Sequence, residues 1–89
     1  MPKIEIYTKD YCPYCQAAKS LLRAKGVDFS EKSLTESPEL RSEMMRRAKG
    51  RHTVPQIFVD DVGLGGFDNI ALLDERGKLD QILASRQDA

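Results

Sequence analysis

The order of strands and helices is the feature that most constrains the fold of this chain. Glycine and proline divide its 89 residues into short segments with either strand-like or helix-like spacing of apolar residues. The predicted strands are residues 3–8, 27–34, 54–61 and 62–66, and the predicted helices are residues 13–26, 37–50 and 67–84. The resulting order, β-α-β-α-β-β-α, predicts an α/β fold.

Connection rules turn this order into a topology. Two strands joined by a helix are nearly always parallel, with a right-handed crossover. The last two strands are separated only by a turn at Asp60 and Asp61, so they must be antiparallel. We therefore predict a single domain over residues 1–89, built on a four-stranded mixed sheet with helices on both faces.

The ends of the helices carry their own signals. Pro13 and Pro38 suit the first positions of the first two helices, because proline lacks the N–H that is unpaired there. Ser37 precedes Pro38 and is the predicted N-cap of the second helix. Gly77 is expected to interrupt the last helix.

Charge and hydropathy exclude several classes of partner. The 14 basic and 14 acidic residues cancel, so no overall field attracts nucleic acid or an anionic membrane, and any charge-based recognition must be local. No stretch approaches the length of a membrane span, and the first ten residues lack the apolar core of a signal peptide. We expect a cytoplasmic protein with neither nucleic-acid nor membrane partners.

Cys12 and Cys15 are the two cysteines of the chain, and three interpretations apply to them. A structural zinc ion needs four ligands, whereas the chain adds only His52, so we expect no metal bound within one chain. A metal shared by two chains stays open. A structural disulfide over so short a loop stabilises by only ~2 kcal/mol and is rare in a reducing cytoplasm.

A redox role explains the position of the two cysteines. Cys12 falls where a strand gives way to a helix, and the unpaired N–H groups and dipole of a helix start favour a thiolate. Lys9 can add a positive charge, and Cys15 lies one turn further in. Cys12 is therefore the predicted nucleophile and Cys15 the resolving thiol. A C-x-x-C pair beside a βαβ pattern is typical of thioredoxin-like proteins.

Two distant segments are expected to meet the cysteines. In "TVPQIF" (53–58), a cis Val54–Pro55 bond would leave the backbone of Val54 free to pair with an extended peptide, although Pro55 can also be an ordinary strand-entry proline. In "GGFDN" (65–69), the backbone and Asp68 can hold the carboxylate and ammonium of an amino-acid end. A plain turn in which Asp68 caps the helix is the alternative.

Taken together, "CPYC", "TVPQIF" and "GGFDN" resemble glutaredoxin, and the likeness spans nearly the whole chain. The short length is similar to that of small bacterial dithiol glutaredoxins. The resemblance implies a thioredoxin fold and a glutathione-dependent thiol–disulfide oxidoreductase that needs no tightly bound cofactor and uses glutathione as co-substrate. It also implies a monomer acting on glutathionylated or disulfide-containing proteins, with ribonucleotide reductase as one family target.

The resemblance also assigns residues. Cys12 matches the family's nucleophile and Cys15 its second cysteine. The positions that correspond to glutathione-binding residues are Lys9, Tyr14, Val54, Pro55, Gln56, Gly66, Phe67 and Asp68. Asn69 departs from the family, because many members carry a second aspartate there; one negative charge near the ammonium of glutathione is therefore missing.

Two competing functions share these features. A related electron donor reduced by a thioredoxin-type reductase would have the cysteines without the glutathione groove. An iron–sulfur carrier would bridge two chains through Cys12 and two glutathione molecules, although relatives of that kind usually have serine at the second cysteine position.

Overall fold

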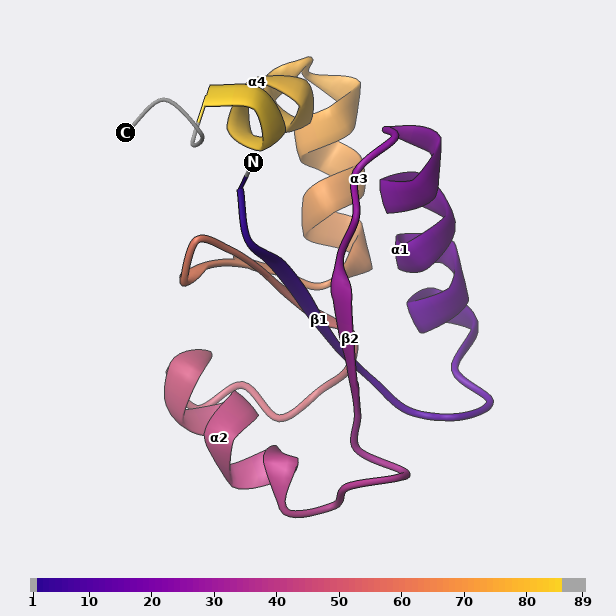
Figure 1. Ribbon diagram of the computed structural model, residues 1–89, viewed down its shortest axis with the longest axis vertical. Coiled ribbons are helices and arrows are strands. Elements are labelled where there is room, and N and C mark those ends of the chain that lie inside the picture. Colours follow the sequence, from indigo (N-terminus) through magenta and orange to yellow (C-terminus); the bar gives the residue numbers. More distant parts are fainter. Residues whose placement is uncertain (1, 86–89) are drawn as a thin grey trace.

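A computed structural model describes residues 2–85 and contains one four-stranded sheet with four helices (Figure 1). The elements are β1 (Ile4–Thr8), α1 (Pro13–Ala24), β2 (Ser30–Ser33), α2 (Leu40–Arg47), β3 (Gln56–Val59), β4 (Val62–Gly65), α3 (Phe67–Glu75) and α4 (Lys78–Ser85). The strand order is β2-β1-β3-β4, with β1 and β2 parallel and the other two pairs antiparallel. The predicted order and mixed sheet are confirmed.

Each face of the sheet packs against its own helices, as predicted. Ile4, Ile6, Ile57 and Val59 point to one face and pack against apolar side chains of α1, α3 and α4. Tyr7 of β1 and Phe58 of β3 lie on the opposite face, since successive strand residues alternate, and pack with Met44 of α2. Figure 1 shows α2 set well apart from the other three helices, which cover the first face.

Glu5 of β1 is also buried, because it lies on the face of the strand that α2 covers. Glu5 is only 6% exposed, and its carboxylate accepts hydrogen bonds from Arg47 at 2.8 and 3.3 Å. Lys32 on the neighbouring strand lies 3.1 Å from the same carboxylate. The hydrogen bond from Arg47 holds the pKa of Glu5 below its ordinary value despite the opposing effect of burial.

Two predicted boundaries are wrong. The helix α2 begins at Leu40 with Glu39 at its N-cap, so Ser37 is not the cap and Pro38 is not the first helical residue. Both residues lie in a preceding turn, where the N–H of Leu40 donates to the carbonyl of Ser37 at 3.0 Å. The second strand begins at Ser30 instead of residue 27, because the residues before it pack against the core without pairing in the sheet.

The connections after β3 and α3 agree with prediction. Asp60 and Asp61 have φ of +49° and +70°, the left-handed pair expected of a two-residue hairpin turn between β3 and β4. Gly77, at φ +73°, separates α3 from α4. None of the helices over residues 2–85 is both long and apolar enough to cross a bilayer.

Candidate active site

The first cysteine caps the helix that carries the second. Cys12 is the N-cap of α1 in an extended conformation, and Pro13 follows at the first helical position. The backbone N–H of Cys15 donates to the Sγ of Cys12 at 3.2 Å, so one of the unpaired donors of the helix start is directed at this sulfur. The predicted placement of Cys12 is confirmed.

The two thiols have different environments. Cys12 is half-buried, whereas Cys15 is fully buried, and both are free thiols. Burial, followed by the hydrogen bond with Cys12, raises the pKa of the Cys15 thiol to about 12, while a backbone hydrogen bond from Lys9 acts in the opposite direction. Cys15 therefore keeps its proton at neutral pH, and Cys12 is the thiol that a substrate can reach.

A groove of about 460 Å³ lies beside the helix that carries the cysteines. Its lining residues are Tyr14, Arg51, His52, Thr53, Val54, Pro55, Gln56, Gly66, Phe67, Asp68 and Asn69. The set includes every residue predicted to bind glutathione except Lys9. Three segments that are distant in sequence therefore meet around one cavity, which we call the peptide groove.

Tyr14 links the cysteines to the peptide groove. It lies two residues after Cys12 in the first turn of α1, and the residue is 63% exposed. Its ring centroid lies 6.3 Å from that of Phe67, with the two planes inclined at 34°. The two rings form an apolar wall where the first turn of α1 meets the first turn of α3.

The segment around the proline has the predicted geometry. The Val54–Pro55 peptide bond is cis. Gln56 is buried, and its side-chain amide donates to the carbonyl of Thr53 at 3.0 Å, which fixes the loop before β3. A Cβ atom added to Gly66 would lie only 3.3 Å from the carbonyl oxygen of Pro55. The missing side chain at Gly66 thus lets the two groove segments approach closely.

The start of α3 excludes the alternative in which Asp68 caps the helix. The N-cap is Gly66, and its N–H donates to the Oδ1 of Asn69 at 3.1 Å, so Asn69 and not Asp68 supports the helix start. Asp68 is the exposed second residue of the helix, in its first turn, and lines the peptide groove. Its carboxylate is therefore not engaged as a cap and can meet a ligand.

Sequence reasoning missed part of the groove lining. Arg51, His52, Thr53 and Asn69 all contribute to it, although none of them was assigned to glutathione binding. Each of them lies within or directly beside one of the two segments singled out, so proximity to those motifs was the available signal. Over residues 2–85, no group of three or more His, Cys, Asp or Glu side chains could hold a metal ion.

Fold and site together define a dithiol–disulfide exchange protein of the thioredoxin fold. The Glutaredoxin family profile matches residues 4–64. The chain is 51% identical to Glutaredoxin 3 of Escherichia coli over 93% of its length and 99% of that protein. It is 48% identical to a glutaredoxin of Pseudomonas aeruginosa, with 96% and 100% covered.

Solved structures agree with this assignment. The solution structure of a Brucella melitensis glutaredoxin matches with a TM-score of 0.80 and 48% identity, over 93% of this chain and 89% of that one. The dithiolic glutaredoxin 2-C-Grx1 of Trypanosoma brucei brucei matches with a TM-score of 0.81 and 34% identity, over 93% and 88%. The chain belongs to the glutaredoxin family of glutathione-dependent thiol–disulfide oxidoreductases.

Proposed function

We propose that residues 1–89 act as one monomeric, cytoplasmic dithiol glutaredoxin domain in which Cys12 is the nucleophile and Cys15 the resolving cysteine. The observation that carries this proposal is the contrast between the accessible sulfur of Cys12 and the buried, protonated sulfur of Cys15 at the start of one helix. Glutathione is the co-substrate, and no cofactor is held tightly. Ribonucleotide reductase is one candidate among the disulfide-containing targets.

The monothiol reaction uses Cys12 alone. Its thiolate attacks the glutathione sulfur of a protein–glutathione mixed disulfide, and the protein thiolate leaves and takes a proton. Cys12 is then joined to glutathione. A second glutathione thiolate attacks the sulfur of the bound glutathione, which releases oxidised glutathione and regenerates Cys12. In total, one free glutathione is consumed for each mixed disulfide, and the glutathione released from the substrate protein becomes the other half of the oxidised glutathione.

The dithiol reaction also needs Cys15. Cys12 attacks one sulfur of a protein disulfide, and the other sulfur leaves as a thiol after protonation. Cys15 loses its proton and attacks the sulfur of Cys12, so that a Cys12–Cys15 disulfide forms and the second protein thiol is released. Two glutathione molecules then reduce this disulfide. The position of Cys15 one turn into α1 supports this role.

Glutathione is proposed to lie in the peptide groove with its sulfur toward Cys12. Backbone groups of Val54, beside Pro55, pair with the central cysteine of the tripeptide. The start of α3, with Gly66, Phe67 and the carboxylate of Asp68, takes the γ-glutamyl end.

The other end of glutathione meets the remaining assigned residues. Lys9 and Gln56 take the glycine carboxylate, and the Tyr14 ring forms the wall of the groove. Most of these residues line one cavity, which supports the proposed pose. Lys9 lies outside the lining and would act from the rim.

A coupled assay tests the function. The protein is given a small mixed disulfide, glutathione, glutathione reductase and NADPH, and NADPH oxidation is followed. Wild type and Cys15→Ser are expected to turn over the substrate, whereas Cys12→Ser is expected to be inactive. Full activity in Cys12→Ser would refute the assignment. An absence of NADPH oxidation with the wild type would favour a donor that a thioredoxin-type reductase reduces.

A further inference from the structure

Residues 46–52 contain four of the 14 basic residues and no acidic one, although the whole chain is neutral. Arg46, Lys49 and Arg51 are exposed, and in the described part of the chain none of them forms an ion pair. Arg47, the fourth, is paired with acidic side chains. This basic segment therefore places uncompensated positive charge on one part of a balanced surface.

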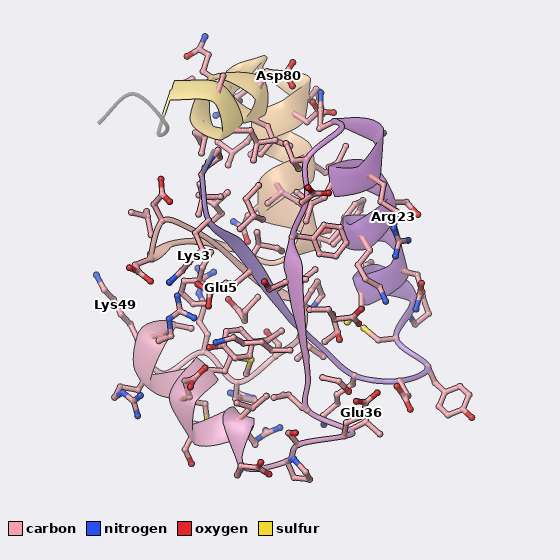
Figure 2. The ribbon with its side chains drawn as sticks, in the orientation of Figure 1. Lys3, Glu5, Arg23, Glu36, Lys49 and Asp80 are labelled. Carbon is pink, nitrogen blue, oxygen red and sulfur yellow. The ribbon has the colours of Figure 1, made fainter. Side chains whose placement is uncertain are left out.

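The backbone holds the basic segment in a defined turn after α2. Lys49 adopts a left-handed conformation at φ +56°, and Gly50 follows at φ +94°. The N–H of Gly50 donates to the carbonyl of Met45 at 2.8 Å, and that of Arg51 donates to Ala48 at 3.3 Å. Figure 2 shows Lys49 projecting outward from the C-terminal end of α2. The turn thus fixes where the charges lie.

A second groove, of about 480 Å³, lies between the basic segment and the β3–β4 hairpin. We call it the hairpin groove. Strand β4 supplies Val62, Gly63 and Leu64, and the basic side is formed by Arg47, Lys49 and Arg51. Asp61 is the one acidic residue among those that line this groove, and it is paired with Arg47 at 3.1 Å.

Gly63 shapes the wall that the hairpin contributes. A Cβ atom added there would lie 3.1 Å from the ring of Phe58, closer than side chains ordinarily pack. The backbone of β4 therefore lies directly against that buried ring. The groove combines an apolar and main-chain wall on one side with cations on the other, which suits an extended polypeptide bearing carboxylates.

The hairpin groove and the peptide groove are adjacent and share part of their lining. Arg51, Gln56 and Asn69 line both of them. A polypeptide whose cysteine reacts beside the peptide groove can therefore extend into the hairpin groove. The whole molecule measures 32 Å along its longest axis, which about ten extended residues would cover.

We infer that the hairpin groove and the basic segment bind an acidic stretch of the substrate protein, within about ten residues of its reactive cysteine. The inference rests on the proposed function, because it needs a polypeptide substrate joined through a disulfide to glutathione. Charges of this kind raise the rate of encounter, and salt weakens their effect. The basic segment would thus favour acidic substrate proteins over basic ones.

Three glutathionylated peptides test the inference, identical except that the residues flanking the cysteine are acidic, neutral or basic. The acidic peptide is expected to have the highest kcat/KM, with an advantage that shrinks as salt is added. In R46S/K49S, the ratio of kcat/KM between the acidic and neutral peptides should fall about tenfold, as expected for two exposed charge pairs. The matched control R76S/K78S removes the same charge at the α3–α4 junction and should keep the wild-type ratio.

The outcomes separate the two proposals. Equal kcat/KM for all three peptides, with good turnover of the neutral one, would overturn the inference and leave the proposed function intact. Failure to turn over any of the three peptides would instead overturn the proposed function. If single-stranded DNA of equal charge inhibits the acidic peptide as strongly as a non-glutathionylated acidic peptide does, the surface binds polyanions in general, and the inference for polypeptides is wrong.

Discussion

The guanidinium of Arg47, at the end of α2, forms a bidentate ion pair with the carboxylate of Glu5, on the face of strand β1 that α2 covers. The two side chains tie the helix to the sheet through charges that are largely withdrawn from water. The same guanidinium donates to the hydroxyl of Tyr7 at 2.8 Å and lies 4.2 Å from the centroid of the Phe58 ring. One guanidinium thus serves both the ion pair with Glu5 and the packing of the aromatic rings on this face of the sheet.

Removing the carboxylate should destabilise the protein strongly. Glu5→Gln is expected to lower the free energy of unfolding by about 3 kcal/mol at neutral pH, because Arg47 keeps a largely buried charge without its bidentate partner. Urea unfolding would measure the change. Glu36→Gln, in an exposed loop (Figure 2), is the matched control and should have little effect. Equal stability of the two variants would contradict the role of the pair.

The same pair predicts a dependence of stability on pH. The pKa of Glu5 is lower in the folded protein than its ordinary value, so the ionised form stabilises the fold. This contribution is fully present above the unfolded pKa of about 4.3 and is lost as pH falls through the lower folded pKa. The difference in unfolding free energy between wild type and Glu5→Gln should therefore shrink below about pH 4. A constant difference across that range would argue against a titrating pair.

Selective alkylation tests the contrast between the two thiols. Because the pKa of the buried Cys15 thiol is raised to about 12, it should resist iodoacetamide in the reduced native protein at any pH well below that value. Cys12 should be modified, and peptide mass mapping would show which site carries the label. In urea both cysteines should react, which provides the control. Equal labelling in the native protein would contradict the burial of Cys15.

At Gly65 the structure leaves no room for a side chain. Its φ is +97°, and an added Cβ would lie 2.5 Å from the Oδ1 of Asn69 and 2.8 Å from a nitrogen of Arg51. Gly65→Ala should cost about 1–3 kcal/mol of stability and raise the KM for glutathione, since it displaces the cap of α3. Gly77→Ala, at φ +73° with nothing within 4 Å, isolates the backbone strain. Similar losses in both variants would show that the contact with Asn69 is unimportant.

Asn69→Asp tests the residue that departs from the family pattern. Aspartate keeps the acceptor for the Gly66 N–H and adds a negative charge in the first turn of α3. The helix dipole should make the variant more stable by about 0.3–1 kcal/mol, and the added charge should lower the KM for glutathione by favouring its ammonium group. Thermal unfolding and steady-state kinetics measure the two effects. A higher KM would place the ammonium elsewhere.

The sequence predicts most of the fold because its signals are local. Proline and glycine mark where elements begin and end, as at Pro13 and Gly77, and the connection rules then leave few topologies. Tertiary contacts decide the rest. The burial of Glu5 depends on Arg47, which lies far along the chain, and nothing in the local pattern of β1 indicates that partner.

The candidate site shows the same division. Cys12, Tyr14 and Pro55 stand in short motifs, and the structure brings the motifs together as expected. The capping role of Asn69 was missed because Asp68 is an equally good cap by residue type, and only the exact register of α3 distinguishes them. Arg51 was missed because its position depends on the turn that follows α2.

The two outer strands of the sheet bear on how the protein behaves at high concentration. An open strand edge can template pairing with another chain, which is a common route to aggregation. Here β2 has the sequence SEKS, so its edge carries charged side chains, whereas β4 has only four residues, two of them glycine, and pairs with β3 through a shifted register. Neither edge offers a long, flat, apolar template. The sheet can therefore end at β2 and β4 without a further strand or helix to cover these edges and prevent pairing between chains.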